Sequence, residues 1–277
     1  EVVGGHDPAD YHSERLYAKV RDGKKVPISI VYKKGYKKNG QGNLLLYAYG
    51  SYGSTNDPSF SSTRLSILDR GFAYAIAHIR GSQTYGRPWY EDGKMFNKMN
   101  TFTDFVDCSK YLIQNNYTGP GHLFAMGGSA GGLLMGAVVN LAPELYRGVI
   151  AAVPFVDVIN TMSDASIPLT SNEWDEWGDP RKKDEYDYMM TYSPYDNVYN
   201  ADYPNMLVTA GYFDSQVQYW EPVKWVAKLR DYKVGENILY LHTNMDAGHG
   251  GKSGRFRRYK ESALKYAFIL DLAGIKY

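Results

Sequence analysis

The sequence predicts an α/β fold with a mostly parallel central sheet flanked by helices on both faces. Short apolar runs of strand length alternate with longer segments of helical spacing along the chain. One such strand and helix are joined by a sharp, glycine-rich turn. The 277 residues are 44% hydrophobic, which is enough to form one large core. In a sheet of this kind, ligands bind at the carboxyl ends of the strands.

The N-terminal half begins with a segment that lacks periodicity. Residues 1–13 are therefore expected to form a linker or arm, and the folded domain is expected to span residues 14–277. Two strand-like runs, 14–20 and 26–32, flank Asp22-Gly23, which is a hairpin signal. The other elements expected in this half are buried strands at 44–48 and 72–79 and helices at 61–69 and 100–116.

The C-terminal half continues the alternation. Pro222 is compatible with its helix only because it lies near the helix start. Residues 155–203 are irregular and rich in acidic and aromatic side chains, and they are too long for a plain connection. We expect this stretch to be functional or partly helical. The regular elements expected here are strands at 122–126, 148–153, 206–210 and 238–241, and helices at 133–139, 217–231 and 253–272.

The bulk composition excludes several classes of function. A formal net charge of +1 gives no electrostatic basis for binding nucleic acid or an acidic membrane surface. No apolar run approaches the ~20 residues that a membrane-spanning helix needs. Cys108 is the sole cysteine, so no internal disulfide forms, which fits a reducing compartment. Neither a metal-ligand spacing nor a phosphate-binding loop occurs, so no metal or cofactor is expected.

The glycine-rich turn at 127–131 reads G-x-S-x-G and places Ser129 between a strand and a buried helix. That context is typical of a nucleophile elbow, where a strained backbone demands small neighbours. The helix that follows would direct its amide N–H groups toward developing negative charge. The alternative is a structural turn in which Ser129 only caps the helix.

A serine hydroxyl needs an adjacent base, and the base needs an orienting acid. In α/β-hydrolases the chain order is Ser, then Asp or Glu, then His. Asp214 follows one predicted strand and His249 follows the next, so we expect them to fill these roles. His242 is interpreted as a core histidine, and Asp246 is the weaker candidate for the acid.

An oxyanion hole needs two donors. The backbone N–H of Ala130, next to the nucleophile, is expected to supply one of them. The loop after the strand at 44–48 carries Tyr49, whose phenol can supply the other, with Tyr52 as the alternative.

The segment 172–177 sets three acids among large apolar rings. Such rings lower the local dielectric and strengthen pairing with a guanidinium, so this segment could form a pocket for a basic side chain. A solvated acidic loop explains the same residues equally well.

Five segments together resemble the oligopeptidase B branch of the prolyl oligopeptidase family of serine peptidases. They are 47–53, 127–132, 153–158, 214–222 and 248–256. The resemblance covers essentially the whole chain. It implies an α/β-hydrolase fold and a cytoplasmic endopeptidase that cleaves short peptides after Arg or Lys. It also implies Ser129, Asp214 and His249 as the triad, with Tyr49 and the Ala130 amide as the oxyanion hole.

The resemblance also implies how substrate is selected. Glu173 and Asp175 match the two acids that bind the P1 base, and Phe155 lines the same pocket. The family usually has Glu where this chain has Asp175, so the carboxylate sits on a shorter arm. Asp57 matches an acid that favours a basic residue at P2. Its usual partner acid is replaced by Ser59, so we expect a weaker preference for paired basic residues.

Members of the family carry a β-propeller before the catalytic domain, and no blade repeat of ~40–50 residues is present here. The chain also starts at Glu1 and not at Met. We therefore expect it to be the catalytic part of a longer protein. Two other function classes stay open, namely another serine acyl hydrolase of this fold, such as an acylaminoacyl-peptidase or esterase, and an inactive binding module.

Overall fold

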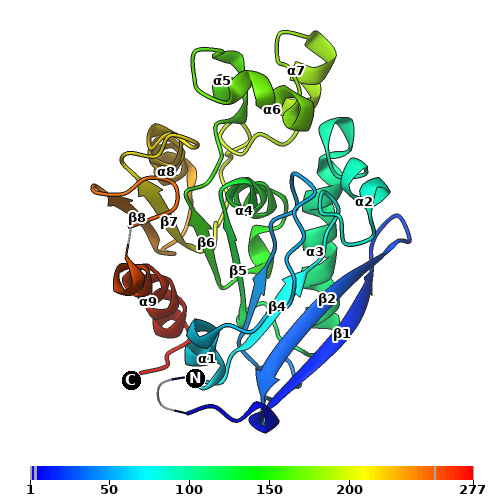
Figure 1. Ribbon diagram of the computed structural model, residues 1–277, viewed down its shortest axis with the longest axis vertical. Coiled ribbons are helices and arrows are strands. Elements are labelled where there is room, and N and C mark those ends of the chain that lie inside the picture. The colour runs from blue at the N-terminus through cyan, green and yellow to red at the C-terminus, as the bar shows by residue number, and fades with distance from the viewer. Residues whose placement is uncertain (1, 3–4, 253, 277) are drawn as a thin grey trace.

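The computed structural model describes residues 2, 5–252 and 254–276. Within them lies an eight-stranded sheet with the order β1-β2-β4-β3-β5-β6-β7-β8 (Figure 1). Strands β1 and β2 form an antiparallel hairpin, β2 pairs antiparallel with β4, and the other neighbours pair in parallel. The strands are β1 (Tyr11–Lys19), β2 (Lys25–Lys33), β3 (Leu44–Tyr47), β4 (Ala73–Ala77), β5 (Leu123–Gly128), β6 (Gly148–Ala152), β7 (Asn205–Gly211) and β8 (Leu239–Asn244). The predicted mostly parallel sheet is confirmed.

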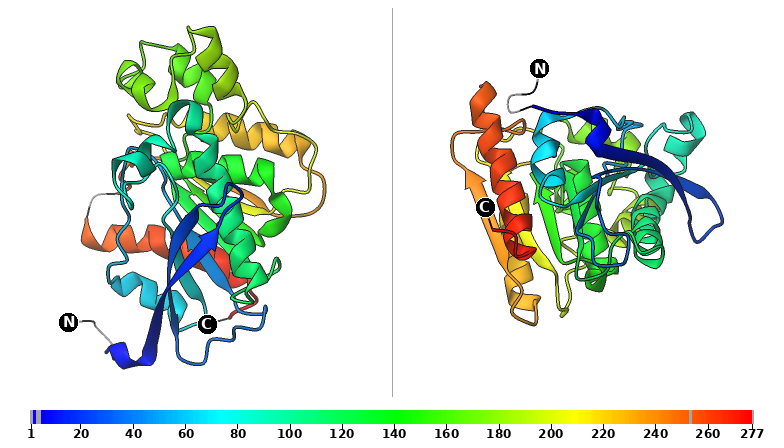
Figure 2. Two further views of the ribbon diagram at one scale, coloured as in Figure 1. Left: turned by 90° about the vertical axis from the view of Figure 1, so that its right-hand side faces the viewer. Right: turned by 90° about the horizontal axis from the view of Figure 1, so that it is seen from below.

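Helices cover both faces of this sheet, as the side-chain alternation along each strand requires. Leu45 and Phe124 pack with α1 and α9 on one face, whereas Leu44 and Leu123 pack with α3, α4 and α8 on the other. Figure 2 shows α9 and α3 on opposite sides of the strands. The helices are α1 (Ser62–Leu68), α2 (Arg87–Glu91), α3 (Met99–Gln114), α4 (Ala130–Leu141), α5 (Val158–Ser163), α6 (Thr170–Trp177), α7 (Lys183–Met190), α8 (Trp220–Tyr232) and α9 (Arg255–Leu272), with 3-10 turns at Pro8–Asp10, Met95–Asn97 and Pro143–Leu145.

At the level of elements, one expected boundary changes and one expectation is confirmed. Residues 11–13 belong to β1, so the expected arm ends before Tyr11. The length of β1 is set by its partner, because Tyr11 pairs with Lys33 at the far end of β2, and not by alternation in its own sequence. The stretch 155–203 is partly helical, since it contains α5, α6 and α7.

The parallel strands place their carboxyl ends along one edge of the sheet. Helices α5, α6 and α7 extend beyond this edge (Figure 1). The loops that follow β3, β5, β7 and β8 carry the predicted catalytic residues, so the fold gathers them where α/β sheets bind ligands.

Candidate active site

Ser129 stands in the turn between β5 and α4. Its backbone has φ 58° and ψ −119°, a left-handed conformation that costs a non-glycine residue about 1–3 kcal/mol. Its backbone N–H donates to the Ala152 carbonyl at 2.9 Å, which ties the turn to β6. Its side chain makes no capping hydrogen bond to α4. The geometry is that of a nucleophile elbow, with the hydroxyl left available.

The glycines around Ser129 are required by close backbone contacts. A Cβ on Gly127 would lie 2.1 Å from the Gly131 carbonyl oxygen. A Cβ on Gly132 would lie 2.4 Å from the Pro154 Cα. Both positions therefore exclude a side chain, and the sharp strand-to-helix turn depends on them.

Asp214 and His249 come together from the loops after β7 and β8. The His249 Nδ1 lies 2.7 Å from the Asp214 Oδ2. The carboxylate side chain is fully buried, and the imidazole is 17% exposed. Oδ1 accepts the backbone N–H groups of Gln216 and Val217, each at 2.9 Å. When Nδ1–H donates to this fixed acceptor, Nε2 is left with a lone pair, as a general base requires.

The two alternative residues lie outside the Asp214–His249 pair, although His242 lines the same cavity as His249. The Asp246 side chain is 78% exposed and accepts from the Lys252 Nζ at 3.0 Å. His242 is exposed, so its interpretation as a core histidine is wrong. It lies on β8, at the edge of the sheet, where alternate side chains face solvent.

Ser129 and His249 line two neighbouring cavities. The Ser129 cavity measures about 290 Å³, and the His249 cavity, which also borders Ala152 at the end of β6, measures about 190 Å³. Between the described atoms of these two residues no hydrogen bond is formed. Such catalytic contacts are often long without substrate and tighten in the Michaelis complex.

Two donors converge on Ser129. Burial raises the pKa of Tyr49 to about 12, although a hydrogen bond with the Ser129 side chain lowers it. The phenol therefore keeps its proton at neutral pH and can donate. Ala130 is the first residue of α4, where a backbone N–H has no partner within the helix. Tyr52, the alternative donor, directs its hydroxyl to Glu173 instead, at 2.5 Å.

The Ser129 cavity has one acidic side chain and aromatic walls. Glu173 lines it and accepts from the Tyr52 hydroxyl and, at 3.0 Å, from the Trp177 Nε1. Phe155 forms a wall, with its ring 5.3 Å from that of Trp177. A cation that entered would meet a carboxylate between apolar rings, where ion pairing is stronger than in water.

Asp175, expected to bind the P1 side chain, does not reach this cavity, and Asp57 was expected to act at P2 instead. Asp175 is exposed and absent from the cavity lining, and Asp57 is also exposed. One face of α6 carries Glu173, Glu176 and Trp177, which are spaced i, i+3 and i+4. Asp175 lies off this face.

Glu176, which sequence reasoning missed, is 3% exposed and accepts the Tyr52 backbone N–H at 2.9 Å. Helical spacing within the acidic segment was the signal that could have singled it out.

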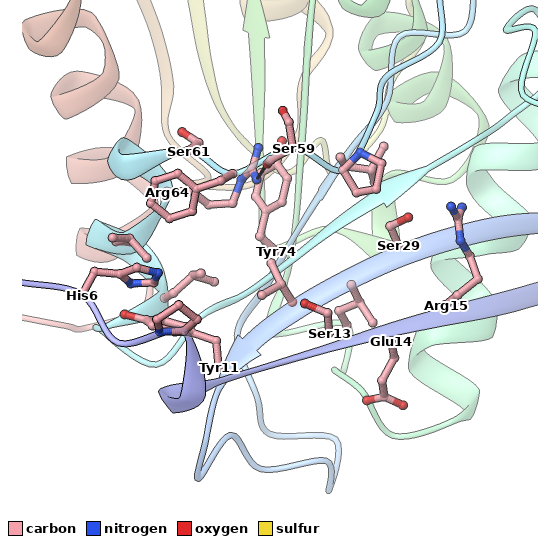
Figure 3. A pocket seen from close by; sticks show the side chains of 18 residues that line it. His6, Tyr11, Ser13, Glu14, Arg15, Ser29, Ser59, Ser61, Arg64 and Tyr74 are labelled. Carbon is pink, nitrogen blue, oxygen red and sulfur yellow. Dashed lines mark hydrogen bonds between the residues drawn. The ribbon is translucent and has the colours of Figure 1, made fainter. Parts of the chain in front are cut away.

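Four further features of the described residues bear on function: another cavity, the single cysteine, metal-ligand clusters and membrane-spanning helices. A larger cavity of about 540 Å³ lies between the hairpin, the N-terminal arm and α1, lined by Tyr11, Ser59 and Arg64 among others (Figure 3). Cys108 is buried in α3, and burial raises the pKa of its thiol. Across the described ranges, no cluster of three His, Cys, Asp or Glu side chains could ligate a metal. Nor does any helix there have the length and apolarity to traverse a bilayer.

Comparison with known proteins shows the family. The family model described as the prolyl oligopeptidase family matches residues 58–276. The chain is 57% identical over 276 residues to dipeptidyl aminopeptidase BI of Pseudoxanthomonas mexicana, and 55% identical over 275 residues to protease 2 of Moraxella lacunata. Each alignment takes in 99% of this chain but only 38% and 40%, respectively, of the relative.

Solved structures give the same result. Oligopeptidase B from Leishmania major superposes with a TM-score of 0.96 at 47% identity, over 98% of this chain and 38% of that one. Oligopeptidase B from Trypanosoma brucei with covalently bound antipain superposes with a TM-score of 0.96 at 45% identity, over 99% of this chain and 39% of that one. The chain thus spans about two-fifths of the length of these proteins.

Proposed function

Because the chain belongs to the prolyl oligopeptidase family of serine peptidases and has the α/β-hydrolase fold, we propose that it forms the catalytic domain of an oligopeptidase specific for basic residues. It would cleave short peptides on the carboxyl side of Arg or Lys. The observation that carries this specificity is Glu173, a carboxylate held between aromatic rings in the cavity of Ser129. A neutral side chain would gain no ion pairing from this half-buried acid.

The proposed reaction is acyl transfer in two steps. The Ser129 hydroxyl attacks the scissile carbonyl while His249 takes its proton, and Asp214 holds the imidazole in the required tautomer. The Tyr49 hydroxyl and the Ala130 N–H stabilise the oxyanion. His249 then protonates the leaving amine, and water hydrolyses the acyl-enzyme by the same route.

Substrate selection would rest mainly on Glu173 and Phe155 at P1. Asp175 and Asp57 are exposed and would act at the rim, as longer-range attractions for basic peptides. By analogy with the longer relatives, a β-propeller domain would be the partner that limits substrate length, and the compartment would be the cytoplasm.

The test is hydrolysis of N-blocked fluorogenic peptides with Arg, Lys, Ala or Pro at P1. Cleavage after Arg and Lys should vanish in Ser129→Ala. Glu173→Gln should lower kcat/KM for Arg by about 30-fold or more, since removing one partner of a buried charge pair costs about 2–5 kcal/mol. Asp175→Asn is the matched control and should change kcat/KM for Arg less than about fivefold, because exposed ion pairs contribute about 0–1 kcal/mol. Equal cleavage of all four peptides would refute the proposed specificity.

A second candidate follows from one relative. The protein from Pseudoxanthomonas mexicana is named a dipeptidyl aminopeptidase, a type of enzyme that needs a free amino terminus. The same peptides without the N-terminal block distinguish the two activities. Release of a dipeptide from free peptides alone would favour this candidate over the endopeptidase.

A further inference from the structure

A lysine ammonium is buried beneath the loop that carries Tyr49 and Tyr52. Lys98 immediately precedes α3 and is fully buried. Its Nζ donates to the Gly50 carbonyl at 2.7 Å, the Ser51 hydroxyl at 2.8 Å and the Gly93 carbonyl at 3.2 Å. A buried positive charge at a helix N-terminus is unfavourable for two reasons, because burial removes its hydration and because the helix dipole repels it. Burial lowers its pKa to about 8.

The opposite charge comes from α6. Glu176 accepts the Tyr52 backbone N–H at 2.9 Å and the Tyr90 hydroxyl at 2.5 Å. Its charge favours the protonated form of Lys98. The Trp177 ring lies 4.9 Å from the Lys98 Nζ and completes the enclosure. Residues 50–52 are therefore held from two sides. Lys98 donates to Gly50 and Ser51, and Glu176 accepts from Tyr52.

The backbone of this loop is strained, so surrounding contacts must hold it in place. Tyr52 has φ 58°, a conformation that costs a non-glycine residue about 1–3 kcal/mol. It persists only where surrounding contacts enforce it. The ring of Tyr52 also packs edge-on against Trp177 at 5.5 Å, which fixes the side chain that bonds Glu173.

We propose that Lys98 and Glu176 are a positioning pair that fixes the 49–53 loop, and through it both the Tyr49 donor at Ser129 and the Tyr52 contact to Glu173. Neither residue lines the Ser129 cavity. The inference rests on the proposed function, because it gives Tyr49 and Glu173 the roles assigned there. It predicts that these two buried residues control both the rate of acyl transfer and the affinity for a basic side chain.

The test is a double-mutant cycle between Lys98→Met and Tyr49→Phe. Methionine keeps the length of the side chain and removes the charge. Lys98→Met alone should lower kcat about 10-fold to 100-fold on substrates with Arg or Ala at P1, and it should raise KM only with Arg. In the Tyr49→Phe background its further effect on kcat should be less than about threefold. Multiplicative losses in the double variant would overturn the proposal.

Two further variants keep the test informative if Lys98→Met folds poorly. Ser51→Ala removes one of the three acceptors without a large void and should show the same pattern, weaker, at about twofold to fivefold. Lys228→Met removes a lysine on α8 that bonds the Tyr195 carbonyl at 2.8 Å, and it should leave both constants unchanged. A folded Ser51→Ala enzyme with wild-type constants would count against the proposal.

A p-nitrophenyl ester separates this inference from the proposed specificity. If the wild type hydrolyses the ester but shows no preference for Arg, the specificity for basic residues fails. The Lys98–Tyr49 coupling is then still measured on the ester. If the free-energy effect of the double substitution is less than the sum of the two single effects, the proposal is supported; if the effects are fully additive, it is overturned.

Discussion

Replacing Asp214 by asparagine should trap His249 in the wrong tautomer. The backbone N–H groups of Gln216 and Val217 point at Oδ1, each at 2.9 Å. An asparagine must keep its carbonyl oxygen there, so its NH₂ group takes the place of Oδ2, 2.7 Å from the His249 Nδ1. That group cannot accept a hydrogen bond from Nδ1–H. The imidazole would therefore carry its proton on Nε2, where it can no longer accept one from Ser129.

The size of the effect follows from this geometry. A wrong tautomer in a Ser-His-Asp triad lowers kcat by about 10⁴-fold. That loss corresponds to about 5.5 kcal/mol of transition-state stabilisation. Because the side chain keeps its shape and its two backbone donors, the melting temperature should stay close to that of the wild type.

The assay is single-substrate kinetics with an Arg fluorogenic peptide, together with thermal denaturation. Asp246→Asn is the matched control, because this exposed acid pairs with Lys252 and not with His249. It should retain activity within about twofold of the wild type, as expected of an exposed pair. An Asp214→Asn enzyme within tenfold of the wild type, or a larger loss in Asp246→Asn, would refute the assignment of the acid.

Three other variants test the rest of the site. Tyr49→Phe removes the proposed oxyanion donor and should lower kcat about 10²–10³-fold with little change in KM. An unchanged kcat would contradict the proposed role. Glu221 in α8 is fully buried and accepts the backbone N–H groups of Val156 and Asp157, next to Phe155. Burial raises its pKa from 4.5 to about 7, so the folded state binds this proton more tightly than the unfolded chain. The resulting stability is present below pH 4.5 and lost as the pH rises through about 7. Calorimetry should therefore show the melting temperature of Glu221→Gln rising relative to the wild type between about pH 5 and about pH 8, and a constant difference would contradict this. Gly132→Ala should lower the unfolding free energy by about 1–3 kcal/mol through its clash with Pro154, whereas Gly121→Ala, which meets nothing within 4 Å, should not.

Features encoded by short sequence spacing could be predicted from the sequence. The elbow at Ser129 was recognisable from its local G-x-S-x-G pattern, in which Gly127 is required by a backbone contact with Gly131 only four positions away. Asp214 and His249 were recognisable because each directly follows a strand, and parallel strands end at one edge of the sheet. The mostly parallel order of the sheet followed from the alternation of strands and helices.

Roles created by contacts distant in sequence could not be predicted. Lys98 acquires its role from Gly50 and Ser51, and Glu176 from Tyr52, which is 124 positions away. In the sequence Glu176 looks equivalent to Asp175. Only the phase of α6 places one of them in the interior and the other in solvent. The missing Ser129–His249 hydrogen bond is likewise a property of loop positions that no local pattern encodes.

The central claim is that Ser129 is the activated nucleophile of a site that recognises arginine. A fluorophosphonate probe tests it most directly, with intact-mass measurement and peptide mapping of the product. We expect one phosphonyl group per chain, located on Ser129, absent in Ser129→Ala and blocked by prior incubation with a peptidyl arginine aldehyde. Labelling at another residue, or no labelling of the folded protein, would contradict the claim.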